Sequence, residues 1–269
     1  MSELKFTTIS NARKQTKLSY LGGVNISQKI IKSQKVNSFM TYCLYLAPAS
    51  TSGFNVCTNS TPECRKGCLA TSGRAAVELW SNINKIHNCR INKTKLFHEQ
   101  PSFFMDWLIA EIKSFQNKAN KLGYGFAVRL NGTSDINWAN VKHNGLNIFE
   151  TLSDIQFYDY TKMPSKFYGI ADNYHLTLSY TGHNWEVCKF ILSMGFNVAM
   201  IFNVPNNKPL PKSYNGYDVV NGDLTDLRIK DAKGIIVGLH WKKIADKAVN
   251  EEIRNSVFVI QPNDVNVMF

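Results

Sequence analysis

Half of the cysteines in this chain lie in one short segment. Cys57, Cys64 and Cys68 fall within "CTNSTPECRKGC", which gives the spacing Cys-x6-Cys-x3-Cys with Pro62 between the first two. Three thiolates from one segment can bind three corners of a 4Fe–4S cluster and leave the fourth iron open for a substrate or cofactor. The spacing therefore predicts an iron–sulfur cluster as the leading interpretation.

Zinc binding and simple packing are the alternatives for these thiols. Structural zinc sites usually have four ligands, often from Cys-x2-Cys pairs, and this chain has no such pair. A fourth ligand would have to be Cys43, Cys89, His87 or His98. Packing as small hydrophobic side chains suits Cys43 and Cys188, which lie in apolar runs, better than the polar cysteine segment. A disulfide is not expected, because cytoplasmic thiols stay reduced.

Polar side chains follow several apolar runs, at points where parallel strands would end. The carboxyl ends of such strands share one edge of the sheet, where α/β enzymes carry their active sites. The candidates for catalytic roles, in binding or proton transfer, are Asp135, Arg129, Asn131, Lys162 and Asp223. The candidates for binding a nucleic acid or another substrate are Tyr158, Tyr160, Ser179, Asp226, Arg228 and Lys242.

Several of these candidates also have a structural interpretation. Asp135 follows a Gly-Thr-Ser turn and suits either a nucleophile or general base, or the cap of a following helix. The charged residues within 223–228 could form an ion-pair cluster that only orients their loop. Tyr158 and Tyr160 could stack on a base or pack as ordinary strand aromatics.

The apolar pattern defines the elements that must position these residues. Short apolar runs predict strands at 40–47, 125–130, 155–160, 174–180, 196–202, 217–220, 234–239 and 257–260. Helical spacing predicts helices over 101–123 and 182–195, and a further helix is expected to begin near Arg65.

Strands that alternate with helices favour parallel βαβ units. The predicted class is α/β with a (β/α)8-like barrel, complete or incomplete, and a doubly wound open sheet is the alternative. We expect residues 40–269 to form a single α/β barrel domain. Residues 1–39 are then a basic N-terminal extension packed on the barrel.

Composition and charge narrow the function classes. The chain has 31 Lys and Arg against 20 Asp and Glu, and the net charge of +11 favours a nucleic acid or nucleotide as partner. No apolar run reaches the roughly eighteen residues of a membrane span, and the N-terminus lacks a secretory pattern, so we expect a cytoplasmic protein without a membrane partner. The absence of G-x-G-x-x-G, P-loop and G-x-S-x-G motifs disfavours dinucleotide oxidoreductases, P-loop NTPases and serine hydrolases.

The assembled motifs resemble the phage gene product 88 family over about residues 40 to 260. The resemblance implies a phage protein with a conserved cysteine loop, which would act in the host cell cytoplasm. It rests, in this order, on LYLAPASTSGFNVCTNSTPECRKGCL, ATSGR, VRLNGTSDINW, FYDYTK, YHLTLSYT, FNVAMIF, VVNGDLTDLRIKD and GIIVGL.

A weaker similarity is to radical-SAM enzymes, whose barrels hold three cysteines just after the first strand. Their usual spacing is Cys-x3-Cys-x2-Cys, and a Gly-Gly-Glu-like stretch after the second strand helps to hold the SAM amino group. This chain has Cys-x6-Cys-x3-Cys and, after its second predicted strand, residues 131–135 without that stretch. The similarity therefore implies a cluster more strongly than it implies SAM as the partner of that cluster.

These observations favour a phage-encoded iron–sulfur enzyme that acts on a nucleotide or nucleic acid, in base modification or in countering a host defence. One alternative is a base-exchange enzyme similar to guanine transglycosylases, with an aspartate nucleophile and a structural zinc. Another is a non-catalytic, metal-stabilised protein that binds nucleic acid or a host protein. The polar residues at successive strand ends favour the enzyme.

Overall fold

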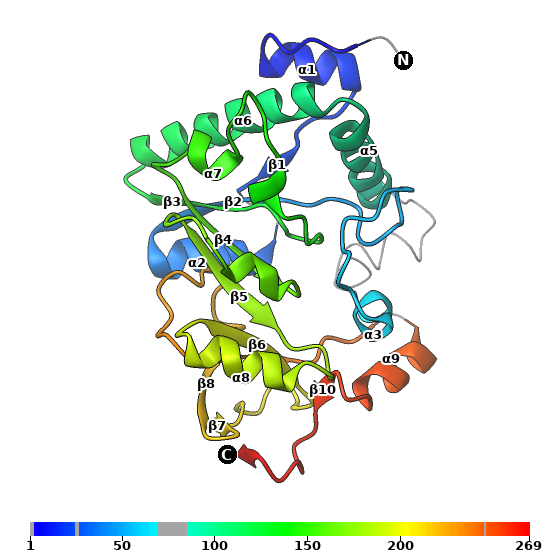
Figure 1. The fold of residues 1–269 in the computed structure, drawn as a ribbon, viewed down its shortest axis with the longest axis vertical. Coiled ribbons are helices and arrows are strands. Elements are labelled where there is room, and N and C mark those ends of the chain that lie inside the picture. The colour runs from blue at the N-terminus through cyan, green and yellow to red at the C-terminus, as the bar shows by residue number, and fades with distance from the viewer. Residues whose placement is uncertain (1–2, 25–26, 69–84, 245) are drawn as a thin grey trace.

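A mixed β-sheet runs through the molecule and carries helices on both of its faces (Figure 1). The computed structural model describes residues 3–24, 27–68, 85–244 and 246–269. The strands are β1 (Gly22–Gly23), β2 (Phe39–Leu44), β3 (Gly125–Arg129), β4 (Gln156–Thr161), β5 (Tyr174–Ser179), β6 (Asn197–Phe202), β7 (Ser213–Tyr214), β8 (Tyr217–Asn221), β9 (Ile236–His240), β10 (Val259–Ile260) and β11 (Val267–Met268).

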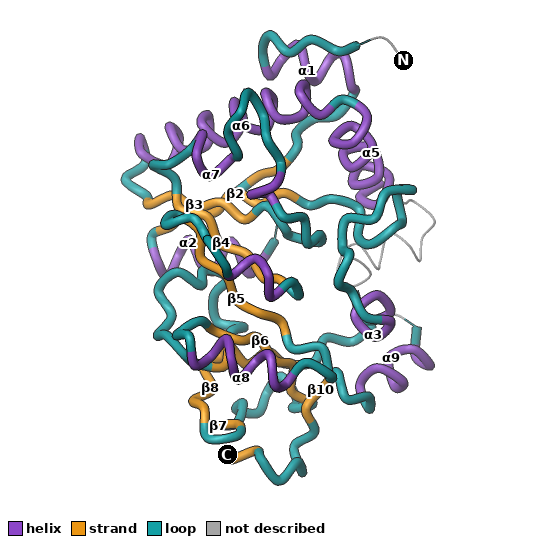
Figure 2. The backbone as a smooth tube through the Cα atoms, in the orientation of Figure 1, coloured by secondary structure: helices purple, strands orange, loops and turns teal. Residues whose placement is uncertain are grey.

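Helices and loops connect these strands along the length of the molecule (Figure 2). The α-helices are α1 (Ile9–Thr16), α2 (Gln28–Asn37), α3 (Pro62–Lys66), α5 (Lys85–Glu99), α6 (Pro101–Lys121), α7 (Ile148–Thr151), α8 (Trp185–Ser193) and α9 (Lys247–Arg254). Short 3-10 helices, η2 (Trp138–Asn140) and η3 (Pro164–Phe167), follow β3 and β4.

All eight predicted strands are present, with boundaries that differ from the prediction by a few residues. The helices expected over 101–123 and 182–195 correspond to α6 and α8. The helix expected from Arg65 instead begins at Pro62, because Thr61 caps it by accepting a hydrogen bond from the Cys64 amide at 3.2 Å. Any continuation of that helix beyond Cys68 lies outside the described residues, as does the ATSGR motif.

The α/β class is confirmed, but the sheet is open. Its order is β1-β2-β3-β4-β5-β6-β9-β8-β7-β11, and β2 through β6, β9 and β8 are parallel neighbours. The free edge of β2 pairs with β1 in antiparallel fashion, and the free edge of β8 pairs with β7. These partners occupy the edges that would have to meet in a barrel, so the described part of the chain closes no (β/α)8 barrel. The order rises from β1 to β6 and then runs β9-β8-β7, and this open arrangement is compatible with the alternative prediction of an open sheet.

A buried carboxylate holds β1 in its place. Glu111 of α6 accepts hydrogen bonds from the amides of Leu21 and Gly22 at 3.0 and 3.1 Å and from the Tyr42 hydroxyl at 2.8 Å. At Gly22 an added Cβ would lie 2.4 Å from the Tyr42 ring, so only glycine fits between β1 and β2. This anchoring fixes β1 on β2 and explains why the edge of β2 is closed to β8.

The two faces of the sheet differ in character. One face packs its apolar side chains, such as Met40 and Val128, into the main core, against which α6 and α8 lie. The opposite face carries a smaller apolar cluster of Ala127, Tyr158 and Leu227. Arg129 lies two residues beyond Ala127 on the same strand and so shares this second face.

The segment predicted as an N-terminal extension contributes to the main core. Ala12 of α1 and Leu21 beside β1 are fully buried there, α1 contacts α6, and α2 contacts β2. Among the described residues, no helix is both long and apolar enough to span a membrane.

Candidate functional site at the carboxyl edge of the sheet

The loops that follow β2, β3 and β4 meet at the carboxyl edge of the sheet, as predicted. We call residues 45–68 the cysteine loop. The Asp135 amide donates to the Val56 carbonyl at 2.7 Å, and the Thr133 hydroxyl donates to the Leu46 carbonyl at 2.5 Å. Asn59 donates from Nδ2 to the Lys162 carbonyl at 3.3 Å. The cysteine loop is therefore held against both neighbouring strand ends.

The three thiols belong to one loop at the carboxyl edge of the sheet, and all three are partly buried. Cys57 is partly buried, and its Sγ is 3.8 Å from the Thr133 carbonyl. Burial raises the pKa of the Cys57 thiol to about 11, and the charges of Cys68, Asp135 and Cys64 act in the same direction. Within the described residues, however, no three His, Cys, Asp or Glu side chains are grouped closely enough to hold a metal ion.

Cys64 is positioned by the packing of α3 on α9. It packs beside the apolar cluster around Ile253, which also includes Trp241. Lys66 of α3 forms an ion pair of 2.5 Å with Glu252 of α9. The C-terminal helix thus fixes the turn of α3 that carries one of the three thiols.

A lysine ammonium lies among these thiols. The Lys162 amide donates to Oδ2 of Asp135 at 2.7 Å, which fixes the backbone of this residue at the end of β4. Burial alone would lower the pKa of Lys162, but the charges of Cys64 and Asp135, a side-chain hydrogen bond to Cys64 and the charge of Cys68 raise it above its usual value. Lys162 therefore stays cationic beside two of the sulfur atoms.

Arg90 of α5 adds a second positive charge near Cys68. Its guanidinium lies 5.3 Å from the centre of the Tyr45 ring. Burial lowers the pKa of Arg90, whereas the charges of Tyr45 and Cys68 oppose that effect. The thiols thus have cationic neighbours from both α5 and the end of β4.

Asp135 holds the strand ends together and is fully engaged by hydrogen bonds. Its Oδ1 accepts from the Thr161 hydroxyl at 2.7 Å and from the Lys166 ammonium at 2.5 Å, and its Oδ2 accepts from the Lys162 amide. Lys166 is buried and also donates to the Ile136 carbonyl at 2.9 Å. Sequence reasoning missed Lys166, because its only notable neighbour in the sequence is Pro164.

Asn131 organises the loop after β3. Its Oδ1 accepts from the Ser134 hydroxyl, the Ile136 amide and the Trp138 indole at 2.9, 2.9 and 3.2 Å. The backbone amide of Asn131 donates to Oδ1 of Asp159 at 2.8 Å. Burial raises the pKa of Asp159 to about 7 despite the nearby charge of Arg129. The sequence places Asp159 at the end of its strand beside Tyr158 and Tyr160, but nothing in the sequence assigned it a role.

A second group of candidates lies on the opposite face of the sheet, in the interior. Nη1 of Arg129 is 3.1 Å from both carboxylate oxygens of Asp226, and the Tyr158 hydroxyl donates to Oδ2 of Asp226 at 3.0 Å. The Arg129 guanidinium lies 4.9 Å from the centre of the Tyr160 ring. Tyr158 is fully buried and Asp226 nearly so, which leaves them in contact with protein groups in this structure.

The remaining candidates make separate contacts, and Ser179 belongs to neither group. Asp223 accepts at Oδ2 from the His240 amide at 2.8 Å, and its Oδ1 is 3.9 Å from Nζ of Lys242. Arg228 donates from Nη2 to the Thr225 carbonyl at 2.8 Å. Ser179, at the end of β5, uses its carbonyl to accept from Asn184 at 3.2 Å.

The predicted residues therefore form two groups. The first combines the cysteines with Lys162 and Asp135, and the second contains the Arg129–Asp226 pair and its neighbours. The two groups are linked through Asp159, whose Oδ1 is 4.0 Å from Nε of Arg129 and which also accepts from Asn131.

Comparison with known proteins identifies a family for nearly the whole chain. The family model described as "Gene product 88" matches residues 4–260, which extends the resemblance seen in the motifs into the N-terminal helices. No match was found among curated proteins or among solved structures.

Proposed function

This chain belongs to the gene product 88 family, and we propose that it is a phage-encoded iron–sulfur enzyme that acts on a nucleotide or nucleic acid. Cys57, Cys64 and Cys68 would hold the cluster. The observation that carries the proposal is the position of these three cysteines in one loop after β2, at the carboxyl edge of the parallel sheet, where Asn59 binds the Lys162 carbonyl at the end of β4. That edge is where open α/β sheets place their ligands.

The donor types and the charges near them suit a cluster, but the three cysteines would have to come closer together to hold it, because no three such side chains among the described residues are grouped closely enough to bind a metal ion. A 4Fe–4S cluster with three thiolates is an anionic group, and its stability and reduction potential depend on nearby charge and on hydrogen bonds to sulfur. Lys162 and Arg90 supply positive charge beside the thiols, and Lys162 supplies the hydrogen bond to Cys64. When bound, the cluster would offer an iron with an open position to a substrate or to a cofactor such as SAM.

The protein residues would bind and orient the substrate around that position. The hydrogen bond from the Lys162 backbone amide to Asp135 fixes the backbone from which the Lys162 ammonium extends. Asp135 already accepts three hydrogen bonds, so we assign it the role of positioning the end of β4. The same engagement disfavours a transglycosylase-like mechanism with Asp135 as nucleophile. The net charge of +11 supports a polyanionic substrate.

Metal analysis tests the cluster directly. We expect protein purified without oxygen to contain about four irons and about four sulfides per chain, with a brown absorption band. Replacing Cys57, Cys64 or Cys68 by Ala should remove most of the iron. The matched control is Cys188→Ala, which alters a buried thiol of α8 and should keep the iron content. A colourless protein with one zinc would contradict the cluster. If the protein contains iron, a change in the electron paramagnetic resonance spectrum of the reduced cluster on adding SAM would identify SAM as a ligand.

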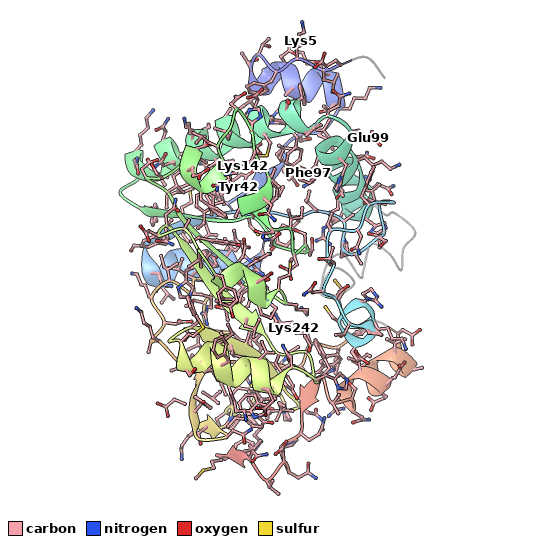
Figure 3. All side chains as sticks on the ribbon, viewed as in Figure 1. Lys5, Tyr42, Phe97, Glu99, Lys142 and Lys242 are labelled. Atoms are coloured by element: carbon pink, nitrogen blue, oxygen red, sulfur yellow. The ribbon has the colours of Figure 1, made fainter. Side chains whose placement is uncertain are left out.

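Binding to labelled single-stranded DNA and RNA of about twenty nucleotides tests whether the substrate is a nucleic acid. Counterion release predicts that affinity falls by at least about tenfold between about 50 and 200 mM salt. Lys242→Gln should reduce the slope of this dependence, because the Lys242 side chain is exposed beside the sheet edge. Lys5→Gln is the control, since Lys5 lies far from Lys242 near the N-terminal end of the molecule (Figure 3). Absence of binding at the lower salt concentration would rule out the nucleic-acid substrate.

A further inference from the structure

A cavity of about 330 Å³ lies at the carboxyl edge of the sheet, where β6 and β10 end side by side. Asn203 directly follows β6, and Pro262 lies two positions beyond β10. The lining surface is almost wholly apolar, and four of the residues that form it carry rings: Pro205, Pro209, Pro262 and Phe269. Sites for small molecules in proteins have volumes of roughly 300–1,000 Å³ and mostly apolar linings, so this cavity has the size for one small ring compound.

Only one of the two polar residues that line the cavity has hydrogen-bonding capacity left in its side chain. Oδ1 of Asn203 accepts from Nε of Arg254 at 2.7 Å, and Nδ2 of Asn203 donates to Oε1 of Gln261 at 2.7 Å. Lys208 also lines the cavity and is exposed, and its ammonium has no hydrogen bond or ion pair with any described residue. A lysine ammonium can donate three hydrogen bonds. The cavity therefore combines an apolar lining with one unpaired positive charge.

The backbone that carries Lys208 is fixed in place. The Lys208 amide donates to the Pro205 carbonyl at 2.9 Å, which closes a tight turn. The Lys208 carbonyl accepts from Nε2 of His240 at 3.0 Å, and Nδ1 of the same ring is 3.0 Å from Oδ2 of Asp223. Proline rings fix the backbone angle φ of the lining segments. The cavity is thus formed before a ligand arrives, which lowers the entropy cost of binding.

We propose that this cavity is a second binding site, which takes a small aromatic compound with an anionic group. The aromatic ring would pack against the proline and Phe269 rings, and the anionic group would lie at the Lys208 ammonium. A sugar or another polar compound would lose its hydrogen bonds to water on this lining without finding new ones, which disfavours it as the ligand. The site uses none of the thiols and stands whether or not the cysteine loop binds a cluster.

Three indole compounds of different charge test the proposal on the wild-type protein. Binding of indole-3-acetate, indole and tryptamine is followed by saturation-transfer NMR, with acetate as the ligand that lacks a ring. We expect indole-3-acetate to bind with a dissociation constant of about 1 mM or lower, and about three- to fivefold more tightly than indole or tryptamine. Acetate should show no saturable binding. Absence of saturable binding by indole-3-acetate, or equal binding of the three indole compounds, would overturn the proposal.

Phe269→Ala tests whether the ring binds in this cavity. It should weaken all three indole compounds at least about threefold, because it removes an aromatic ring from the lining. Met268→Ala is the matched control, since Met268 is the neighbouring residue, is 65% exposed and does not line the cavity. Equal effects of the two substitutions would overturn the location of the site. Both side chains are more than half exposed, so neither substitution should prevent folding.

Lys208→Gln tests the recognition of the anionic group. The affinity for indole-3-acetate should fall to that for indole, and the affinity for indole itself should stay unchanged. Lys5→Gln is the control, because Lys5 lies near the N-terminal end of the molecule, far from β10 and the C-terminal end (Figures 1 and 3). A preference for indole-3-acetate that persists in Lys208→Gln would overturn the role of this lysine.

Discussion

Replacing Asp226 by Asn is expected to lower the free energy of unfolding by about 3–5 kcal/mol, because it leaves the buried Arg129 guanidinium without an anion. The Arg129 side chain is only 12% exposed, and Asp226 is the carboxylate closest to it, with Asp159 farther away at 4.0 Å. The substitution keeps the size of the side chain, so the loss measures charge and not packing. Urea unfolding of the two proteins gives this difference.

Two further variants show whether the effect belongs to the Arg129–Asp226 pair. In the double variant Arg129→Met with Asp226→Asn, the loss should be well below the sum of the two single losses, because the buried guanidinium is removed together with its anion. Glu252→Gln is the matched control, since it breaks an ion pair with Lys66 in which both side chains are about half exposed. It should cost less than about 1 kcal/mol. Additive losses in the double variant would show that the pair is not coupled.

The same pair gives the stability of the protein a dependence on acid. Burial opposes ionisation of Asp226, but the charges of Arg129 and Lys29 lower its pKa from 3.8 to about 2. Since the pKa is lower in the folded protein, the contribution is fully present above about pH 4 and is lost as the pH falls toward 2. Asp226→Asn should therefore flatten the acid side of the stability profile.

The strands could be predicted because buried parallel strands leave a strong local signal. Runs such as 196–202 and 234–239 are almost wholly apolar, and they became β6 and β9. The open edges could not be predicted in this way. β1 has two glycines and no apolar pattern, and its position depends on hydrogen bonds from Leu21 and Gly22 to Glu111, about ninety residues later. Local periodicity carries no information about such a contact, so the barrel prediction was wrong.

The candidate site, like the fold, could be predicted from the sequence only in part. The rule that places function at the carboxyl ends of strands brought the cysteine loop together with Lys162 and Asp135. It could not show that Lys29 joins the group around Asp226, because that contact links residues almost two hundred positions apart. The rule also could not show that the Lys166 ammonium binds Asp135, 31 positions earlier in the chain. In both cases a lysine pairs with a carboxylate that the sequence does not mark as its partner.

Asp135→Asn is expected to destabilise the protein by about 3–5 kcal/mol and to loosen the cysteine loop. The side chain of Lys166 is 2% exposed, and it would keep its positive charge without a carboxylate. The asparagine amide has only one acceptor oxygen. It can serve either Thr161 and Lys166 or the Lys162 amide, so at least one donor at the end of β4 loses its partner.

A second substitution separates these two effects of Asp135→Asn. Adding Lys166→Met removes the buried charge, so the double variant should regain a large part of the lost stability in urea unfolding. It should not restore the Lys162 amide contact when asparagine turns its oxygen toward Thr161. Alkylation of Cys64 should then remain altered in both variants, because Lys162 is the cationic neighbour that holds a hydrogen bond to that sulfur. Wild-type alkylation of Cys64 in the double variant would show that Asp135 acts only through Lys166, and that the position of Lys162 does not depend on this carboxylate.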